Sequence, residues 1–107
     1  MADPVFHLTR AADWEAALAA GEYRRSTLDR TLEEEGFIHC STAAQLAGTF
    51  ARFYRGVPEV VRLEIDPDRL GGVEVRWEGD PEAFPHVYGP LPVDAVVGVT
   101  PVGPDGP

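Results

Sequence analysis

The sequence predicts a small α+β domain with a mixed β-sheet and helices on limited faces. Strand-like and helix-forming segments alternate through the first half of the chain, whereas the second half is mostly strand-like. The 107 residues suffice for one hydrophobic core but not for two. We therefore expect a single globular domain over residues 1–101. Residues 102–107, with the sequence VGPDGP, have little to pack and are expected to form a loose tail.

The first helix is predicted over residues 11–20, a stretch rich in alanine. It follows residues 5–9, which are typical of a short strand, and Thr9 occupies the position of an N-cap. Gly21 is a stop signal for this helix. Residues 22–25 after it are expected to be extended.

The stretch GFIHCS, residues 36–41, has strand character and carries a histidine, the only cysteine and a serine in consecutive positions. Three glutamates precede it at 33–35, which we interpret as a solvated turn or a frayed helix end and not as a metal site. Side chains of an extended chain alternate between two faces. One face of this strand would therefore carry Phe37, His39 and Ser41.

The clearest helix of the sequence follows this strand directly. Thr42 and Gln45 form a Thr-x-x-Gln capping box, and Gly56 with Pro58 ends the helix. The large apolar residues that recur at helical spacing in between are Leu46, Phe50, Phe53 and Tyr54.

Two alternating segments, residues 61–66 and 73–78, predict strands separated by the turn sequence DPDRLGG. If they pair as a direct hairpin, one register sets Arg62 opposite Glu78. Alternatively, the turn carries the chain to another place in the sheet.

The last third of the chain is predicted to end in two further strands. Residues 86–91 are short and extended, and the prolines at 90 and 92 favour a sheet edge or a position that lines a site. The segment before them, GDPEAFP, is expected to be a loop. Residues 95–99 are typical of a last buried strand.

The charge of the chain bears on its partners. The net charge is −9, and all nine cationic residues are arginines. Such a domain repels a phosphate backbone, so we expect no general nucleic-acid binding. The arginine pairs at 24–25 and 52–55 are either solvated or hold one small phosphorylated ligand, a task that suits a bidentate guanidinium.

Three features of the sequence bear on its location. No apolar run approaches the roughly 18 to 20 residues that span a bilayer. The first ten residues lack the basic start and apolar core of a signal peptide. A single cysteine excludes an intrachain disulfide, which agrees with a reducing compartment. We expect a cytoplasmic protein without a membrane partner.

The three histidines share one pattern, in which a hydroxyl residue follows two positions later and so lies on the same face of a strand. This arrangement raises the question of whether they meet in one site. The pairs are His7 with Thr9, His39 with Ser41, and His86 with Tyr88.

Two other chemistries are conceivable for these residues. A nucleophilic cysteine needs a base within hydrogen-bond reach, but His39 and Cys40 point to opposite faces of a strand, so Cys40 is interpreted as a small buried hydrophobe. Three imidazoles and a water also suit catalytic zinc. The spacings of 32 and 47 residues carry no metal signature. No metal is expected.

Several motifs of the chain together resemble the bacterial domain-of-unknown-function 952 family. They are H-L-T, W-E-A-A, G-E-Y, E-G-F-I-H-C-S-T, L-E-I-D, W-E and F-P-H-V-Y-G-P-L, and they cover residues 5 to about 100. That family is grouped with the ADP-ribosyltransferase-like fold, which includes NAD-dependent transferases and RNA 2′-phosphotransferases. The resemblance implies a curved, split sheet with two main helices. It also implies that the central cleft holds NAD or a related ribose phosphate.

The resemblance further implies roles for individual residues. His7, on the first strand, would bond the ribose next to nicotinamide. His39 with Ser41 would flank the nicotinamide ring, to which Tyr23 could add an aromatic face. Glu78 would bond the ribose 2′-hydroxyl and stabilise an oxocarbenium-like transition state.

Other readings of the late-strand residues remain open. Glu78 could instead be a surface carboxylate that faces Arg62. His86 and Tyr88 have no clear counterpart in the transferase motif. The resemblance therefore implies the shared cleft more firmly than it implies transferase activity.

The sequence therefore predicts a small protein that uses a nucleotide-like ligand, with NAD as the cofactor and a transferase or glycohydrolase activity. The alternative is a non-catalytic nucleotide or metabolite binding module, followed by a metal-dependent hydrolase. The predicted catalytic residues are His39, His86 and Glu78, and the predicted binding residues are His7, Thr9, Ser41, Tyr88 and Tyr23.

Overall fold

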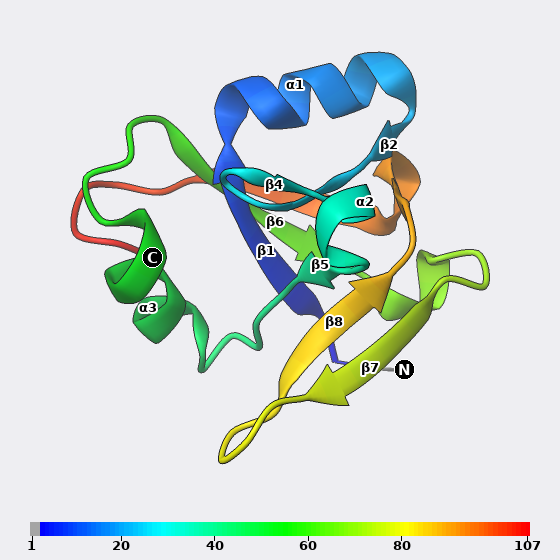
Figure 1. Cartoon of the computed structure of the whole chain (residues 1–107). Coiled ribbons are helices and arrows are strands. Elements are labelled where there is room, and N and C mark those ends of the chain that lie inside the picture. Colours follow the sequence, from blue (N-terminus) through cyan, green and yellow to red (C-terminus); the bar gives the residue numbers. More distant parts are fainter. Residues whose placement is uncertain (1–2) are drawn as a thin grey trace.

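Two three-stranded sheets form the framework of the fold in the computed structural model, which describes residues 3–107 (Figure 1). The first sheet has the order β1–β6–β10 and the second the order β5–β8–β7. Their strands are β1 (Val5–Arg10), β6 (Val60–Ile65), β10 (Val96–Pro101), β5 (Ile38–His39), β8 (Phe84–Tyr88) and β7 (Glu74–Glu78).

Every strand pair in the described part of the chain is antiparallel, so the expected mixed sheet was wrong. Several separate small sheets take its place. The architecture is nevertheless the α+β class that the order of elements predicts. An isolated bridge joins the two large sheets, since the amides of Phe6 and Ser41 each donate to the other residue's carbonyl at 2.7 Å.

Two short ladders complete the strand pairings. They connect the segment after the first helix to the rest of the chain. Their strands are β2 (Glu22–Tyr23) with β9 (Leu91–Pro92), and β3 (Arg25–Thr27) with β4 (Arg30–Thr31).

Helix α1 (Ala11–Ala20) has the predicted bounds and ends at Gly21, whose φ of 88° is in the left-handed region that glycine tolerates. Its N-cap is Arg10, without a side-chain cap, so the predicted Thr9 cap was wrong. Thr9 lies inside β1, where it is buried and its hydroxyl contacts Tyr23.

The glutamate run is a short helix, α2 (Leu32–Glu35). Thr31 and Glu34 form its capping box: the Thr31 hydroxyl accepts from the Glu34 amide, and the Glu34 carboxylate accepts from the Thr31 amide. This cap fixes the start of α2.

Both hydrogen bonds of the predicted box between Thr42 and Gln45 are present, but they close a turn that precedes the helix, whose N-cap is Gln45 without a side-chain cap. The helix itself is α3 (Leu46–Thr49) continued by a π-helical turn, η1 (Phe50–Tyr54). Two 3₁₀ turns, η2 (Pro67–Arg69) and η3 (Val93–Ala95), complete the elements. No helix among residues 3–107 is both long and apolar enough to cross a bilayer.

Strand β1 is buried on both faces and separates two hydrophobic clusters. Val5 packs with Leu63 and Ile65 of β6 and with Trp14 of α1, whereas Phe6 packs on the other face against α3 and η1. Figure 1 shows α1 and α3 on different sides of this sheet. The alternation of β1 therefore directs its odd-numbered residues, His7 among them, toward the interior under α1.

The segments at 61–66 and 73–78 do form strands, β6 and β7, but they do not pair with each other. β6 lies between β1 and β10, and β7 pairs with β8. The hairpin register that set Arg62 opposite Glu78 was therefore wrong, and Glu78 lies opposite Phe84 instead. The turn between the strands carries the chain from one sheet to the other.

The last strands differ from prediction in two ways. β8 is the central strand of its sheet and not an edge, but it agrees with the other alternative, a position that lines a site, because Phe84 and His86 border a cavity. β10 is an edge strand whose Val97 and Val99 are exposed, so it is not the buried strand expected.

The tail over 102–107 folds back and is not loose. The Val102 amide donates to the Val60 carbonyl at 2.9 Å, and the Val102 side chain packs on the cluster around Phe6. Gly106 lies so close to the Phe50 ring that an added Cβ would be 2.9 Å from it.

Candidate functional site

A cavity of about 890 Å³ opens beside the second sheet. One wall consists of His39 and Ser41 from the β5 segment and His86 from β8. The other lining residues come from β1, from α3 and η1 with the turn before them, from the β3–β4 turn, and from the rest of the β7–β8 hairpin. The cavity thus collects residues from five separate parts of the chain.

His39 and His86 are direct partners across the β5–β8 ladder. Their rings meet edge to face, with centroids 5.2 Å apart. Each ring has a carboxylate on one nitrogen: Nε2 of His39 lies 3.3 Å from Glu35, and Nδ1 of His86 lies 2.9 Å from Glu78. When each histidine is neutral and donates to its carboxylate, its second ring nitrogen is left as a proton acceptor.

Glu78 is the anchor of a hydrogen-bonded trio. Its Oε1 accepts from His86 Nδ1 and from the Tyr88 hydroxyl, which lies 2.5 Å away. These two donors, Tyr88 foremost, hold the pKa of the Glu78 carboxyl below its ordinary value. The Oε2 atom has no hydrogen bond within residues 3–107, so it is available to a ligand.

An aromatic stack supports the two histidines from behind. The Phe37 ring stacks on His86 with centroids 4.2 Å apart and meets the edge of His39 at 4.7 Å. Tyr88 packs on Phe37 as well, and the Arg76 guanidinium covers the Tyr88 ring at 4.3 Å. This packing restricts the rotation of both imidazoles.

Part of the cavity lining is apolar. Phe6 and Leu8, which are buried, contribute to it together with Leu28, the exposed Phe53 and the ring of Tyr54, whose hydroxyl donates to the Leu8 carbonyl. The Ser41 hydroxyl lies 2.9 Å from that of Thr49. The site can therefore receive a ligand that has an apolar ring and a polar, hydroxyl-bearing part.

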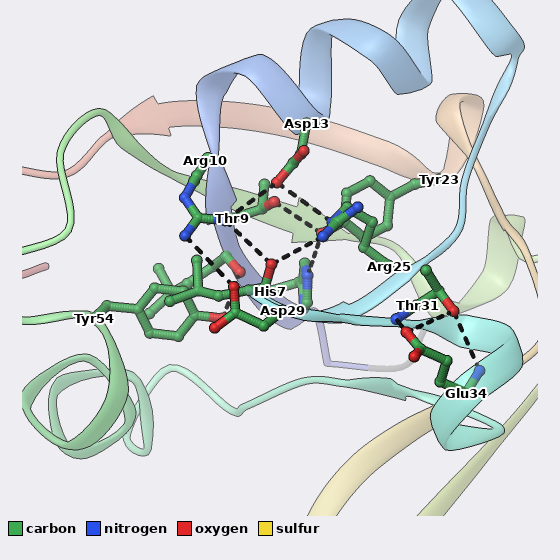
Figure 2. A network of polar contacts seen from close by, with 12 residues as sticks. His7, Thr9, Arg10, Asp13, Tyr23, Arg25, Asp29, Thr31, Glu34 and Tyr54 are labelled. Carbon is green, nitrogen blue, oxygen red and sulfur yellow. Dashed lines mark hydrogen bonds and ion pairs between the residues drawn. The ribbon is translucent and has the colours of Figure 1, made fainter.

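The third histidine, His7, lies outside the cavity in a buried polar network (Figure 2). Its Nδ1 donates to the backbone carbonyl of His39 at 2.5 Å, and its Nε2 lies 2.7 Å from the Tyr23 hydroxyl. That hydroxyl lies 2.8 Å from Oγ1 of Thr9. Burial lowers the pKa of His7 to about 4, so the ring is neutral at physiological pH.

The structure thus divides the predicted site residues into three groups. His39, His86, Glu78 and Ser41 line the cavity. Tyr88 reaches it through its bond to Glu78. His7, Thr9 and Tyr23 are brought together with one another, behind the strand that carries His39.

Cys40 belongs to the hydrophobic core, as predicted, although part of it also borders the cavity. Burial raises the pKa of its thiol to about 12. A thiol with this pKa is almost entirely protonated near neutral pH, so it is a weak nucleophile.

Sequence reasoning missed several residues at or beside the cavity. Glu35 does not line the cavity, but it contacts His39 from α2; the glutamate run was interpreted only as a solvated turn or a frayed helix end, and the position of Glu35 four residues before His39 was the available signal. The loop carboxylates Asp80 and Glu82 and the amide of Gln45, which donates to Glu82, lie at the cavity. No local pattern pointed to these three.

The nearby carboxylates do not add up to a metal centre. Within residues 3–107, no three or more His, Cys, Asp or Glu side chains are arranged to hold a metal ion. The carboxylate partners of His39 and His86 lie on separate elements, α2 and β7.

Solved structures of one bacterial protein are similar to this chain over most of its length. The crystal structure of the protein CC0527 from Caulobacter crescentus is 30% identical, has a TM-score of 0.81, and is matched over 96% of this chain and 90% of that chain. The solution NMR structure of CC0527 is also 30% identical, with a TM-score of 0.75 over 96% of this chain and 89% of that chain.

No curated protein matches the chain. A family model described as "Protein of unknown function (DUF952)" matches residues 8–99, which agrees with the motifs around His39 and His86. The chain therefore belongs to the DUF952 family.

Proposed function

We propose that the cavity is the active site of an enzyme that cleaves or transfers at the ribosyl bond of a nucleotide such as NAD. The observation that carries the proposal is the trio of Glu78, His86 and Tyr88 on the cavity wall, next to His39. Two histidines with carboxylate partners are the usual means of moving protons near neutral pH.

Each residue has a role in this reaction. The C1′–N bond of the ribosyl group breaks, and its electron pair leaves with the ring nitrogen. Glu78, kept ionised by its two donors, stabilises the positive charge that develops at C1′. A water or an acceptor hydroxyl then bonds to C1′, and His39 accepts its proton. His86 keeps the Glu78 carboxylate in place.

The two linked sheets support the further proposal that the fold is a split sheet of the ADP-ribosyltransferase-like type. The Phe6–Ser41 bridge is the point where the halves join, and it borders the cavity. In this proposal the buried network of His7, Thr9 and Tyr23 does not contact the ligand. It has a structural role, because it holds the backbone of His39 in place.

A thermal shift assay tests the proposal. Millimolar NAD should raise the melting temperature of the purified protein, and His39→Ala should abolish the shift. Asp68→Asn, on η2 and away from the cavity, is the control and should keep it. An unchanged melting curve of the wild-type protein with NAD would exclude this ligand.

A non-catalytic binding module is the second candidate. One oxygen of Glu78 is already held by two donors, an arrangement that also suits a rigid recognition site. Incubation with NAD followed by chromatography separates the candidates, since an enzyme releases nicotinamide and a binding module returns NAD unchanged.

A further inference from the structure

We propose that this cavity prefers a cationic or neutral ribosyl compound without a phosphate, such as a pyridinium N-riboside, and binds it more tightly than a dinucleotide. The inference rests on the proposed function, whose substrate class it narrows. It depends on how charge is distributed over the cavity wall.

The wall is acidic. Four carboxylates line the cavity, from Asp29, Glu78, Asp80 and Glu82, against the single guanidinium of Arg52. Its net charge is thus −3 when both histidines are neutral. Asp29 lies 3.9 Å from Arg10, whereas Asp80 and Glu82 have no cationic partner within 4.0 Å in residues 3–107.

Arg52 is poorly suited to hold a pyrophosphate alone. It lies on η1 beside Phe53, with its guanidinium 5.9 Å from the centre of that ring. The β7–β8 loop, which carries Asp80 and Glu82, forms another wall. A phosphate inside the cavity would gain one cation and face several anions, so its transfer from water is unfavourable.

The same charge distribution favours a flat cation. The aromatic rings that line the cavity, among them Phe6 and Phe53, can contact a pyridinium ring, and an aromatic face attracts a cation. The carboxylates that line the cavity then attract the positive charge. As the C1′–N bond breaks, that charge moves from the ring to C1′, where Glu78 stabilises it.

The reaction balances without a further reactant. Water adds to C1′, the glycosidic electron pair stays on the ring nitrogen, and the products are free ribose and neutral nicotinamide. The proton lost by water is accepted by His39 and released to solvent. No phosphate takes part in any step.

Three ligands of graded charge test the proposal: nicotinamide riboside, nicotinamide mononucleotide, which adds one phosphate, and NAD. Binding is measured by calorimetry at low and at high salt, and nicotinamide release by chromatography. We expect the riboside to bind about tenfold tighter than the mononucleotide at low salt, with a smaller ratio at high salt.

A charge-neutral variant supplies the matched control. Asp80→Asn with Glu82→Gln should weaken riboside binding and strengthen mononucleotide binding, whereas Glu33→Gln on α2, outside the cavity, should change neither. The melting temperature of each variant without ligand shows that the fold is retained.

The outcomes separate the two proposals. Equal or tighter binding of the mononucleotide or NAD, with nicotinamide released, would overturn the charge preference and leave the proposed enzyme standing. Failure of all three ligands to bind would overturn both.

Discussion

The imidazoles of His39 and His86 lie 5.2 Å apart on directly paired positions of β5 and β8, and each has its own carboxylate. Adjacent strands fix this separation, since paired residues of an antiparallel ladder project their side chains to the same face. The site therefore depends on the register of two residue pairs, Ile38 with Val87 and His39 with His86.

The two histidines should act as one unit in the ribosyl reaction. We expect His39→Ala and His86→Ala each to lower nicotinamide release by about 10²–10⁴-fold, and the double variant to lose little more. Steady-state rates of the three variants, measured beside their unfolding curves, check this. Multiplicative losses would show that the two imidazoles work independently.

Glu78 should matter for turnover more than for binding. Glu78→Gln keeps the shape of the side chain but removes the charge, so we expect kcat to fall by about 10²–10³-fold with a small change in KM. Glu74→Gln is the matched control, because Glu74 lies on the same strand and face but bonds Arg76 instead of the trio. Equal losses in both variants would remove Glu78 from the chemistry.

Much of the fold follows from local sequence signals. The bounds of α1 and the hydrogen bonds between Thr42 and Gln45 are as predicted, because turns and helix-forming runs act over a few residues. The partners of β6 and β7 could not be predicted in this way. Strand pairing depends on which faces are buried, and β6 is covered by β1 and β10, which lie far from it in the chain.

The candidate site shows the same division between features set by local sequence and features set by tertiary packing. His7, His39 and His86 share one local pattern, a histidine and a hydroxyl two residues later, yet only two of them line the cavity. The difference is the face on which each histidine lies: in β1 the cavity face carries Phe6 and Leu8 and His7 points to the opposite side, under α1, whereas His39 and His86 lie on the cavity faces of β5 and β8. Tertiary packing decides this, and no window of a few residues contains it.

The buried network around Tyr23 should contribute measurably to stability. Tyr23→Phe removes the hydroxyl that contacts both His7 and Thr9 and leaves two buried polar atoms without that partner, so we expect a loss of about 1–3 kcal/mol in the free energy of unfolding. Chemical denaturation provides the measurement. Tyr54→Phe, which removes one bond to a backbone carbonyl, should cost about 1 kcal/mol and serves as the comparison.

The stability of the protein should also depend on the protonation of His7. The pKa of His7 is about 4 in the folded protein and 6.5 as its ordinary value, because burial disfavours the charged ring. Above pH 6.5 both the folded and the unfolded chain hold a neutral ring, and the network is fully stabilising. Between pH 6.5 and 4 only the unfolded chain takes up the proton. The free energy of unfolding therefore decreases by roughly 3 kcal/mol as the pH falls from 6.5 to 4.

A comparison with His7→Gln isolates this effect from the carboxylates, which titrate in the same range in both proteins. The variant should be less stable than the wild-type protein at pH 8, since glutamine cannot keep both ring hydrogen bonds in place. The difference in the free energy of unfolding should then shrink as the pH falls from 6.5 toward 4. Denaturation curves at four or so pH values in this window measure it, and two curves that stay parallel would show that His7 takes up its proton equally in both states.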